Sequence, residues 1–156
     1  MIASLSYGYN VDINLIQLAG AYAAIANSGI KQPITLKKIE TKSLDGIRIL
    51  SEETSKDIMA MLEKVAIRGA PLAKINGYRI GGKTGTAQIA AANYSSDRHN
   101  AIFVGVVPLS QPKLSIAVIV NEPRGKEYYG GRVAAPVFSE IGSHSLRLLG
   151  IAPDDK

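Results

Sequence analysis

The chain has 156 residues, of which 46% are hydrophobic and 20% are charged, and its formal net charge is +5. This size and composition fit one folded domain and exclude a disordered tail or a membrane bundle. Because the sequence holds no cysteine, disulfides, thiolate metal sites and a cysteine nucleophile are excluded as well. The basic residues are scattered among acidic ones, so the charge predicts a solvated surface and no nucleic-acid partner.

The first predicted element is a helix near the start of the chain. Asn14 is a favoured N-cap, Gln17 stands where a capping box needs it, and Gly29 is placed to end the helix. The apolar residues between them have helical spacing and cover nearly every face. They are Leu15, Leu18, Ala19, Tyr22, Ile25 and Ala26. We therefore expect this helix to be buried.

A hairpin and a second helix are predicted next. The two short strands lie near residues 34–40 and 46–50, and a turn at residues 44–46 joins them. Ser51 is the expected N-cap of the second helix, which residues 68–71 end. The expected apolar stripe of this helix comprises Ile58, Met61, Leu62 and Val65.

The remaining sequence predicts a sheet and a last helix. Residues 78–89 are typical of a strand interrupted by glycines, and a polar loop follows at residues 93–100. Residues 101–107 and 113–120 are apolar runs separated by a turn, which predicts two central strands joined as a hairpin. The last helix is expected over residues 136–149, because Pro136 suits a first helical turn.

The stretch GYRIGGKTGT, residues 77–86, fits two unrelated motifs. Its G-x4-G-K-T spacing is that of a nucleotide phosphate-binding loop, in which backbone N–H groups wrap a phosphate and a helix follows the lysine. The residues inside this loop are bulky and alternate as in a strand, and Gly85 stands where the helix would begin. An apolar strand that ends near Glu122 is the feature that favours a nucleotide hydrolase, and this interpretation is the weaker one.

The other motif is Lys-Thr-Gly on a strand. Lys83 supplies a fixed positive charge, and the hydroxyls of Thr84 and Thr86 can hydrogen-bond a carboxylate. Gly85 lets a substrate backbone approach closely, and backbone N–H groups at a strand edge can stabilise an oxyanion. The pattern indicates a peptide-binding strand, but three residues alone decide little.

Three longer blocks make the second interpretation specific. They are SYGYNVDINLIQLAGAYAAIANSGI (residues 6–30), GYRIGGKTGTAQ (77–88) with FVGVVP (103–108) after it, and EYYGGRVAAPVFSEIG (127–142). With these blocks, nearly the full chain resembles the C-terminal half of the transpeptidase domain of class B penicillin-binding proteins, of the cell-division type. Asn14-Leu15 departs from the family's frequent Thr-Pro, although asparagine caps a helix equally well.

The resemblance implies the fold and the domain organisation. The expected fold is α+β, a partial penicillin-binding or serine β-lactamase-like fold in which helices pack on an antiparallel sheet. Residues 1–156 would form the C-terminal part of a single transpeptidase domain, and the sheet would be incomplete in this chain.

The resemblance also implies roles for the Lys-Thr-Gly strand. Lys83 would support the nucleophile network and the substrate carboxylate. Thr84 and Thr86 would contact the carboxylate of a D-alanyl peptide or of a β-lactam, with Gly85 beside them. The backbone N–H of Thr86 would be one of two oxyanion donors. No cofactor and no metal are expected.

Two tyrosines and two histidines are further candidates for the site. Tyr128 and Tyr129 match aromatic positions of the family and would either wall the pocket or contact the last helix. His99 and His144 are expected to have surface roles rather than catalytic ones.

The residues that would complete the family's chemistry are not found in this sequence. That chemistry needs a nucleophilic serine at the start of a helix, a lysine one turn later and a Ser-x-Asn loop. Ser28 and Ser110 each precede a lysine by three positions, but Ser28 stands at the end of a predicted helix and Ser110 in a turn. No Ser-x-Asn occurs, and Ser95-Ser96-Asp97, the nearest match, lies in a different loop.

We therefore expect the nucleophile to lie in an upstream half of the domain, which is the expected partner, and this chain alone to be inactive. The complete protein would be a serine-type peptidoglycan D,D-transpeptidase that binds stem peptides and β-lactams. Its expected location is the outer, periplasmic face of the bacterial cytoplasmic membrane, with an anchor absent from this sequence. Uncovered strand edges and helix faces predict partner association, self-association or a swapped dimer of the isolated chain. A non-catalytic binding or scaffold relative remains the alternative.

Overall fold

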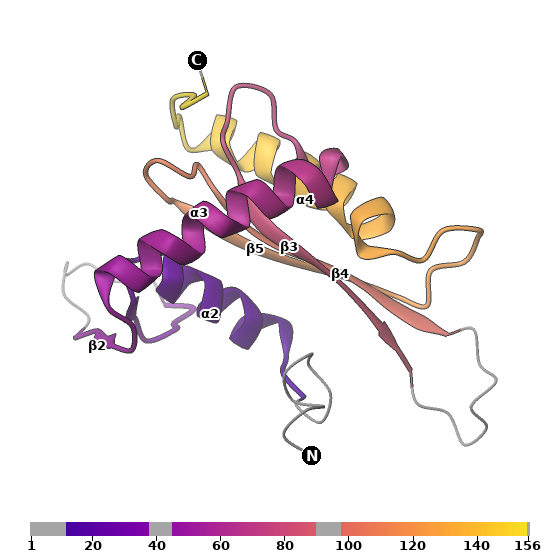
Figure 1. Cartoon of the computed structure of the whole chain (residues 1–156), viewed down its shortest axis with the longest axis horizontal. Helices are drawn as coiled ribbons and strands as arrows, with labels where there is room; N and C mark the ends of the chain where they lie inside the picture. Colours follow the sequence, from indigo (N-terminus) through magenta and orange to yellow (C-terminus); the bar gives the residue numbers. More distant parts are fainter. Residues whose placement is uncertain (1–11, 38–44, 90–97, 156) are drawn as a thin grey trace.

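The computed structural model describes residues 12–37, 45–89 and 98–155 of the chain. The elements are α2 (Leu15–Ala26), β1 (Ile30–Lys31), β2 (Ile47–Arg48), α3 (Glu52–Gly69), the 3-10 helix η1 (Pro71–Ala73), β3 (Gly81–Gln88), β4 (His99–Val107), β5 (Leu114–Asn121) and α4 (Gly130–Leu148). An antiparallel sheet of order β3-β4-β5 has α2 and α3 on one face and α4 on the other (Figure 1). This arrangement confirms the predicted α+β class. Within the described ranges, no helix has the length and apolar character that crossing a bilayer requires.

The main core lies between the sheet and α4. Phe103 of β4 and Phe138 of α4 are fully buried, with ring centroids 4.8 Å apart and ring planes at 59°. Gly105 makes room for this pair, because a Cβ at that position would come within 2.9 Å of the Phe138 ring. The other buried members are Ala66, Ala70, Ala73, Ile75, Ile80, Val107, Val118, Ala134, Ala135 and Leu146. The two aromatic rings therefore fix α4 against the middle strand.

Helix α2 begins as the sequence predicts but is not buried as expected. Asn14 and Gln17 form the full capping box, with the Asn14 side chain accepting from the Gln17 N–H at 2.8 Å. Only Ala24 of the helix is fully buried, while the side chains of Leu15 and Ile16 are 38% and 58% exposed. The prediction of burial was wrong for this chain: α2 packs on β4 and β5, but the cavity that Leu15 and Ile16 line between α2, Ile34 and β5 leaves both side chains partly open.

The predicted hairpin is present, with its first strand misplaced. β1 and β2 pair antiparallel, with Ile30 opposite Arg48, so the first strand lies at Ile30–Lys31 and not at residues 34–40. Residues 34–37 are not in a strand, and residues 38–44, which include part of the predicted turn, lie outside the described residues. The Arg48 guanidinium donates to the carbonyls of Ser28 and Leu50, which ties the end of α2 to the start of α3.

Helix α3 has the predicted cap, and its buried stripe agrees with the predicted one only at Leu62. The Ser51 hydroxyl accepts from the Thr54 N–H at 3.0 Å. The helix buries Ser55, Leu62 and Ala66, whereas Met61 is 58% exposed. Ile58 is half-buried and Val65 is exposed. The face with small side chains is the buried one because α3 approaches β3 closely. A Cβ at Gly81 would come within 3.3 Å of the Leu62 Cβ.

Helix α4 starts earlier than the sequence predicts. It begins at Gly130, and Pro136 lies inside it rather than in its first turn. Proline lacks an N–H and therefore cannot donate to the carbonyl four residues earlier, which belongs to Arg132. The contacts of Gly130 with the sheet, described below, fix where the helix starts and override the local preference of proline.

Candidate functional site

The Lys-Thr-Gly segment is an extended strand. Gly77, with φ +83°, lies in a tight turn that closes through a bond from the Tyr78 N–H to the Ile75 carbonyl. The chain then runs as β3 through Gln88, and no helix begins at Thr84. A phosphate cradle followed by a helix is therefore absent from this segment, and the nucleotide-loop interpretation is wrong.

One edge of β3 is free of strand partners in the described part of the chain. β3 pairs with β4 on one side, in a continuous register that places Thr84 opposite Phe103 and Thr86 opposite Ala101. The Ile89 N–H donates to the Arg98 carbonyl, so Ile89 and Arg98, which follow the last pair of the β3–β4 ladder, form a hydrogen-bonded pair. Because such pairs alternate in an antiparallel ladder, odd-numbered residues of β3 bond to β4. The backbone N–H and carbonyl groups of Thr84 and Thr86 therefore point to the free edge.

Lys83 and Thr84 leave opposite faces of the strand and meet at this edge. Lys83 lies on the face covered by α3, and Thr84 on the face covered by α4. The Lys83 Nζ donates to the Thr84 carbonyl oxygen at 2.9 Å and lies 3.5 Å from the Thr84 Oγ1. The structure thus brings an exposed ammonium group and a hydroxyl together beside the free backbone edge.

The start of α4 lies directly against this strand. The Gly130 N–H donates to the Thr86 Oγ1 at 3.3 Å. A Cβ on Gly130 would overlap the carbonyl oxygens of Ile102 and Gly85, the latter at 2.5 Å. A Cβ on Gly131 would come within 3.3 Å of the Thr84 Cγ2. The two glycines let the start of α4 approach closely enough to contact the side chains of Thr84 and Thr86. No pattern in the sequence indicated this role of Gly130 and Gly131.

The two tyrosines form an aromatic stack just before α4. The rings of Tyr128 and Tyr129 lie 4.4 Å apart, and the Tyr128 hydroxyl donates to the Tyr129 hydroxyl at 3.0 Å. Tyr128 also stacks on His99 of β4, with centroids 4.3 Å apart and planes at 22°. This stack was missed from the sequence, because His99 and Tyr128 are far apart in the chain. His144, by contrast, is exposed on α4 and lies near its own helix backbone.

A cleft of about 460 Å³ opens where β3, the end of α3 and the start of α4 meet. Thr84, Thr86 and Tyr129 line it, so the structure brings three of the residues singled out in the sequence into one space. Arg68 and Arg132 also line it, and neither had been assigned a role. Lys83 and Tyr128 are not part of its lining. In the sequence, the only indication that Arg68 and Arg132 belong to the site is that they adjoin Gly69 and Gly131.

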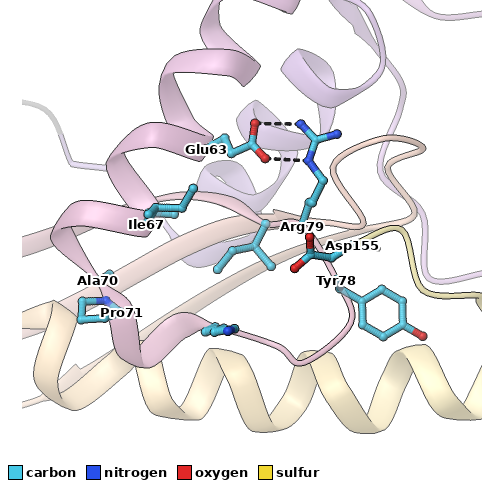
Figure 2. A pocket seen from close by; sticks show the side chains of 10 residues that line it. Glu63, Ile67, Ala70, Pro71, Tyr78, Arg79 and Asp155 are labelled. Carbon is cyan, nitrogen blue, oxygen red and sulfur yellow. Dashed lines mark hydrogen bonds and ion pairs between the residues drawn. The ribbon is translucent and has the colours of Figure 1, made fainter.

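A second cavity, of about 330 Å³, lies between α3, η1, the segment before β3 and the C-terminal tail (Figure 2). Figure 2 shows the Arg79 guanidinium and the Glu63 carboxylate joined by two parallel bonds, at 2.7 and 2.8 Å. This pair forms the polar side of a largely apolar cavity that includes Ile67 and Ile80. None of the lining residues belongs to β3.

The C-terminal tail, residues 149–155, binds the segment that precedes β3, residues 77–80. The two Asp154 carboxylate oxygens accept from the Arg79 N–H at 2.8 Å and from the Ser110 N–H at 3.0 Å. The Asp154 N–H in turn donates to the Gly77 carbonyl. Partial burial acts to raise the pKa of Asp154, but hydrogen bonds from Ser110 and Arg79 and the charge of Arg79 outweigh it, so this pKa lies below its ordinary value. The tail therefore holds the β3 entry and the β4–β5 turn together.

The two serines with a lysine three positions later do not begin helices. Ser28 follows α2 with φ +53°, and Lys31 after it lies in β1. Ser110 lies in the β4–β5 turn. The geometry at both sites differs from a serine and a lysine on successive turns of one helix. Ser95, Ser96 and Asp97 lie outside the described residues.

The relatives found by comparison with known proteins agree on one family. Residues 1–143 match the family described as "Penicillin binding protein transpeptidase domain". The chain is 37% identical to "Peptidoglycan D,D-transpeptidase FtsI" of Escherichia coli over 155 residues, which are 97% of this chain and 26% of that protein. It is 35% identical to "Probable peptidoglycan D,D-transpeptidase PenA" of Neisseria meningitidis, over 97% of this chain and 26% of that protein.

A solved structure agrees with these relatives. The apo transpeptidase domain of Burkholderia pseudomallei penicillin-binding protein 3 matches with a TM-score of 0.89 and 39% identity. The match covers 97% of this chain and 47% of that structure. The chain thus spans about a quarter of the length of the curated relatives and about half of the solved domain. It belongs to the family of penicillin-binding protein transpeptidase domains.

Proposed function

We propose that the complete protein is a peptidoglycan D,D-transpeptidase, and that this chain supplies the Lys-Thr-Gly wall of its peptide site. The observation that carries the proposal is the free edge of β3, where the Thr86 N–H points outward beside the Lys83 ammonium and the Thr84 hydroxyl. The names of the two curated relatives, both peptidoglycan D,D-transpeptidases, support it.

The geometry suits an acyl transfer at this edge. A D-alanyl peptide lying along β3 would place its scissile carbonyl oxygen against the Thr86 N–H, which would stabilise the oxyanion. The hydroxyls of Thr84 and Thr86 would donate to the terminal carboxylate, and Lys83 would supply positive charge. A serine outside this chain would attack the carbonyl carbon, and the bond to the terminal D-alanine nitrogen would break as that amine takes a proton. An amine of a second peptide would then displace the serine oxygen and form the cross-link.

We further propose that the other half of the domain covers the apolar side of α2. Leu15 and Ile16 of α2 are 38% and 58% exposed, and Ile13, just before the N-cap, is 54% exposed, although solvent-facing helix sides are ordinarily polar. The chain spans 47% of the solved relative, which leaves a segment of similar length to occupy this surface. Without it, the isolated chain is expected to self-associate. The proposed site of action is the outer face of the bacterial cytoplasmic membrane, with stem peptides and β-lactams as ligands.

Labelling with a fluorescent penicillin tests the proposal. The chain would be joined to the half that precedes it in the Burkholderia pseudomallei domain, and the label would be followed on a denaturing gel. We expect labelling of the joined domain, loss of more than tenfold in the acylation rate with Lys83→Ala, and no change with Lys113→Ala, an exposed lysine of the β4–β5 turn. Labelling of the isolated 156-residue chain would contradict a nucleophile outside it, and a joined domain that takes no label would favour the non-catalytic scaffold.

A further inference from the structure

Among the described residues, the polar side chains that line the cleft beside β3 are cations and hydroxyls, with no acid. Arg68 comes from the last turn of α3 and Arg132 from the first turn of α4, and both are exposed. Neither guanidinium forms an ion pair with any residue in the described ranges. Thr84 and Thr86 line the same space. Such a set of donors without a carboxylate favours an anionic ligand.

The position of Arg132 strengthens this argument. The N-terminus of a helix carries partial positive charge, so a cation in the first turn is disfavoured there unless an anion compensates it. Arg68 is different, because the C-terminal turn of α3 is a favourable place for a cation. Arg68 and Arg132 adjoin Gly69 and Gly131 in the chain, whose backbones approach closely, since a Cβ on Gly131 would come within 3.1 Å of the Gly69 carbonyl. They therefore border one space rather than two separate surfaces.

The hydroxyls and the arginines can bind different groups at once. The Thr86 Oγ1 already accepts from the Gly130 N–H, so its own hydrogen is available to donate outward. A single carboxylate needs only a small part of a cleft of about 460 Å³, a volume typical of sites that hold larger ligands. There is room for a terminal carboxylate at the threonines and a second acidic group at the arginines.

We propose that Arg68 and Arg132 bind a second carboxylate of the substrate, carried on a side chain of the peptide that precedes its D-alanyl end. The cleft then selects peptides with two carboxylates over those with one. This inference rests on the proposed function for the identity of the peptide, while the anion site itself rests on the cleft alone.

The test uses the joined domain described above and two peptides that differ by one charge, acetyl-Glu-D-Ala-D-Ala and acetyl-Gln-D-Ala-D-Ala, with affinities measured by NMR titration. We expect the glutamate peptide to bind about fivefold more tightly, the size of effect that one exposed ion pair supplies. Arg68→Gln and Arg132→Gln should each reduce this preference and leave the glutamine peptide unaffected. Arg147→Gln, at the other end of α4 and exposed, is the matched control and should keep it.

A titration with glutarate, a free dicarboxylate, separates the two proposals. It should shift the Nε–H signals of Arg68 and Arg132 in the joined domain, and 300 mM salt should weaken the shift. If glutarate leaves both signals unchanged, or if the peptides bind equally well, the second-carboxylate proposal is overturned. If glutarate binds but neither peptide does, the anion site stands and peptide recognition by this chain fails.

Discussion

Replacing Gly130 with alanine tests how α4 is held against the candidate site. Gly130 is buried, and an added Cβ would meet the carbonyl oxygens of Ile102 and Gly85, the latter at 2.5 Å. Carbon and oxygen normally approach no closer than about 3.3 Å. Both oxygens belong to the backbone of the sheet, so neither can rotate away as a side chain would. Overpacking of this kind costs about 1–3 kcal/mol, and alanine's better helix propensity offsets roughly 0.5 kcal/mol of it.

Urea unfolding and thermal melting measure this effect against two neighbouring glycines. A net loss of about 0.5–2.5 kcal/mol at Gly130 corresponds to a fall in Tm of about 1–10 °C for a chain of this size. Gly131→Ala should cost less, because its nearest atom would be 3.1 Å away. Gly69→Ala has open space around the new Cβ and lies at the end of α3, so it should be neutral or slightly stabilising. If Gly130→Ala behaved like Gly69→Ala, the close contact of α4 with β3 and β4 would be refuted.

Three further predictions concern the scaffold around the site. Phe138→Ala should lower the free energy of unfolding by about 3–5 kcal/mol, because it empties the ring pair with Phe103; a loss below about 1 kcal/mol would contradict that packing. Asp154→Asn should cost about 1–2 kcal/mol at pH 7. The folded pKa of Asp154 is lowered, so the stability that its carboxylate supplies is present above about pH 4 and is lost as the pH falls through that pKa. The unfolding free energy of Asp154→Asn should therefore depend less on pH in this acid range than that of the unchanged chain. Plots of unfolding free energy against pH that run parallel for the two proteins would refute the role of Asp154 in holding the tail. Ser51→Ala should cost about 1 kcal/mol through the lost cap, read from the same urea curves, and an unchanged midpoint would count against it.

Much of the fold follows from local patterns in the sequence. The capping residues Asn14 and Ser51 mark the starts of α2 and α3 correctly, because a cap depends on a few neighbouring residues. The apolar runs of β4 and β5 are also placed to within two residues. β4 is the middle strand, as an apolar run predicts, whereas β5 lies at the edge of the described sheet and is only partly buried. Lys83 to Thr86 were correctly expected on a strand, and the pattern of alternating bulky residues before them was the reason.

What the sequence did not predict depends on contacts between distant segments. The start of α4 at Gly130 is set by the carbonyls of β3 and β4, which no local preference of Pro136 can reveal. The stack of His99 on Tyr128 forms only when β4 and the segment before α4 come together. Arg68 and Arg132 share a cleft for the same reason, as they belong to different helices. The apolar sequence of α2 predicted burial, but Leu15 and Ile16 are exposed among the described residues.

Hydrogen exchange at individual amides of β3 tests the proposed role of its free edge most directly. The joined domain would be compared before and after acylation by penicillin, with exchange followed by NMR. The Gly85 N–H, which bonds to β4, should exchange slowly in both states, whereas the Thr86 N–H should exchange fast in the free domain and at least tenfold more slowly once the acyl group occupies the edge. A Thr86 amide whose exchange rate is the same in both states would contradict the assignment of this strand as the acyl-binding wall.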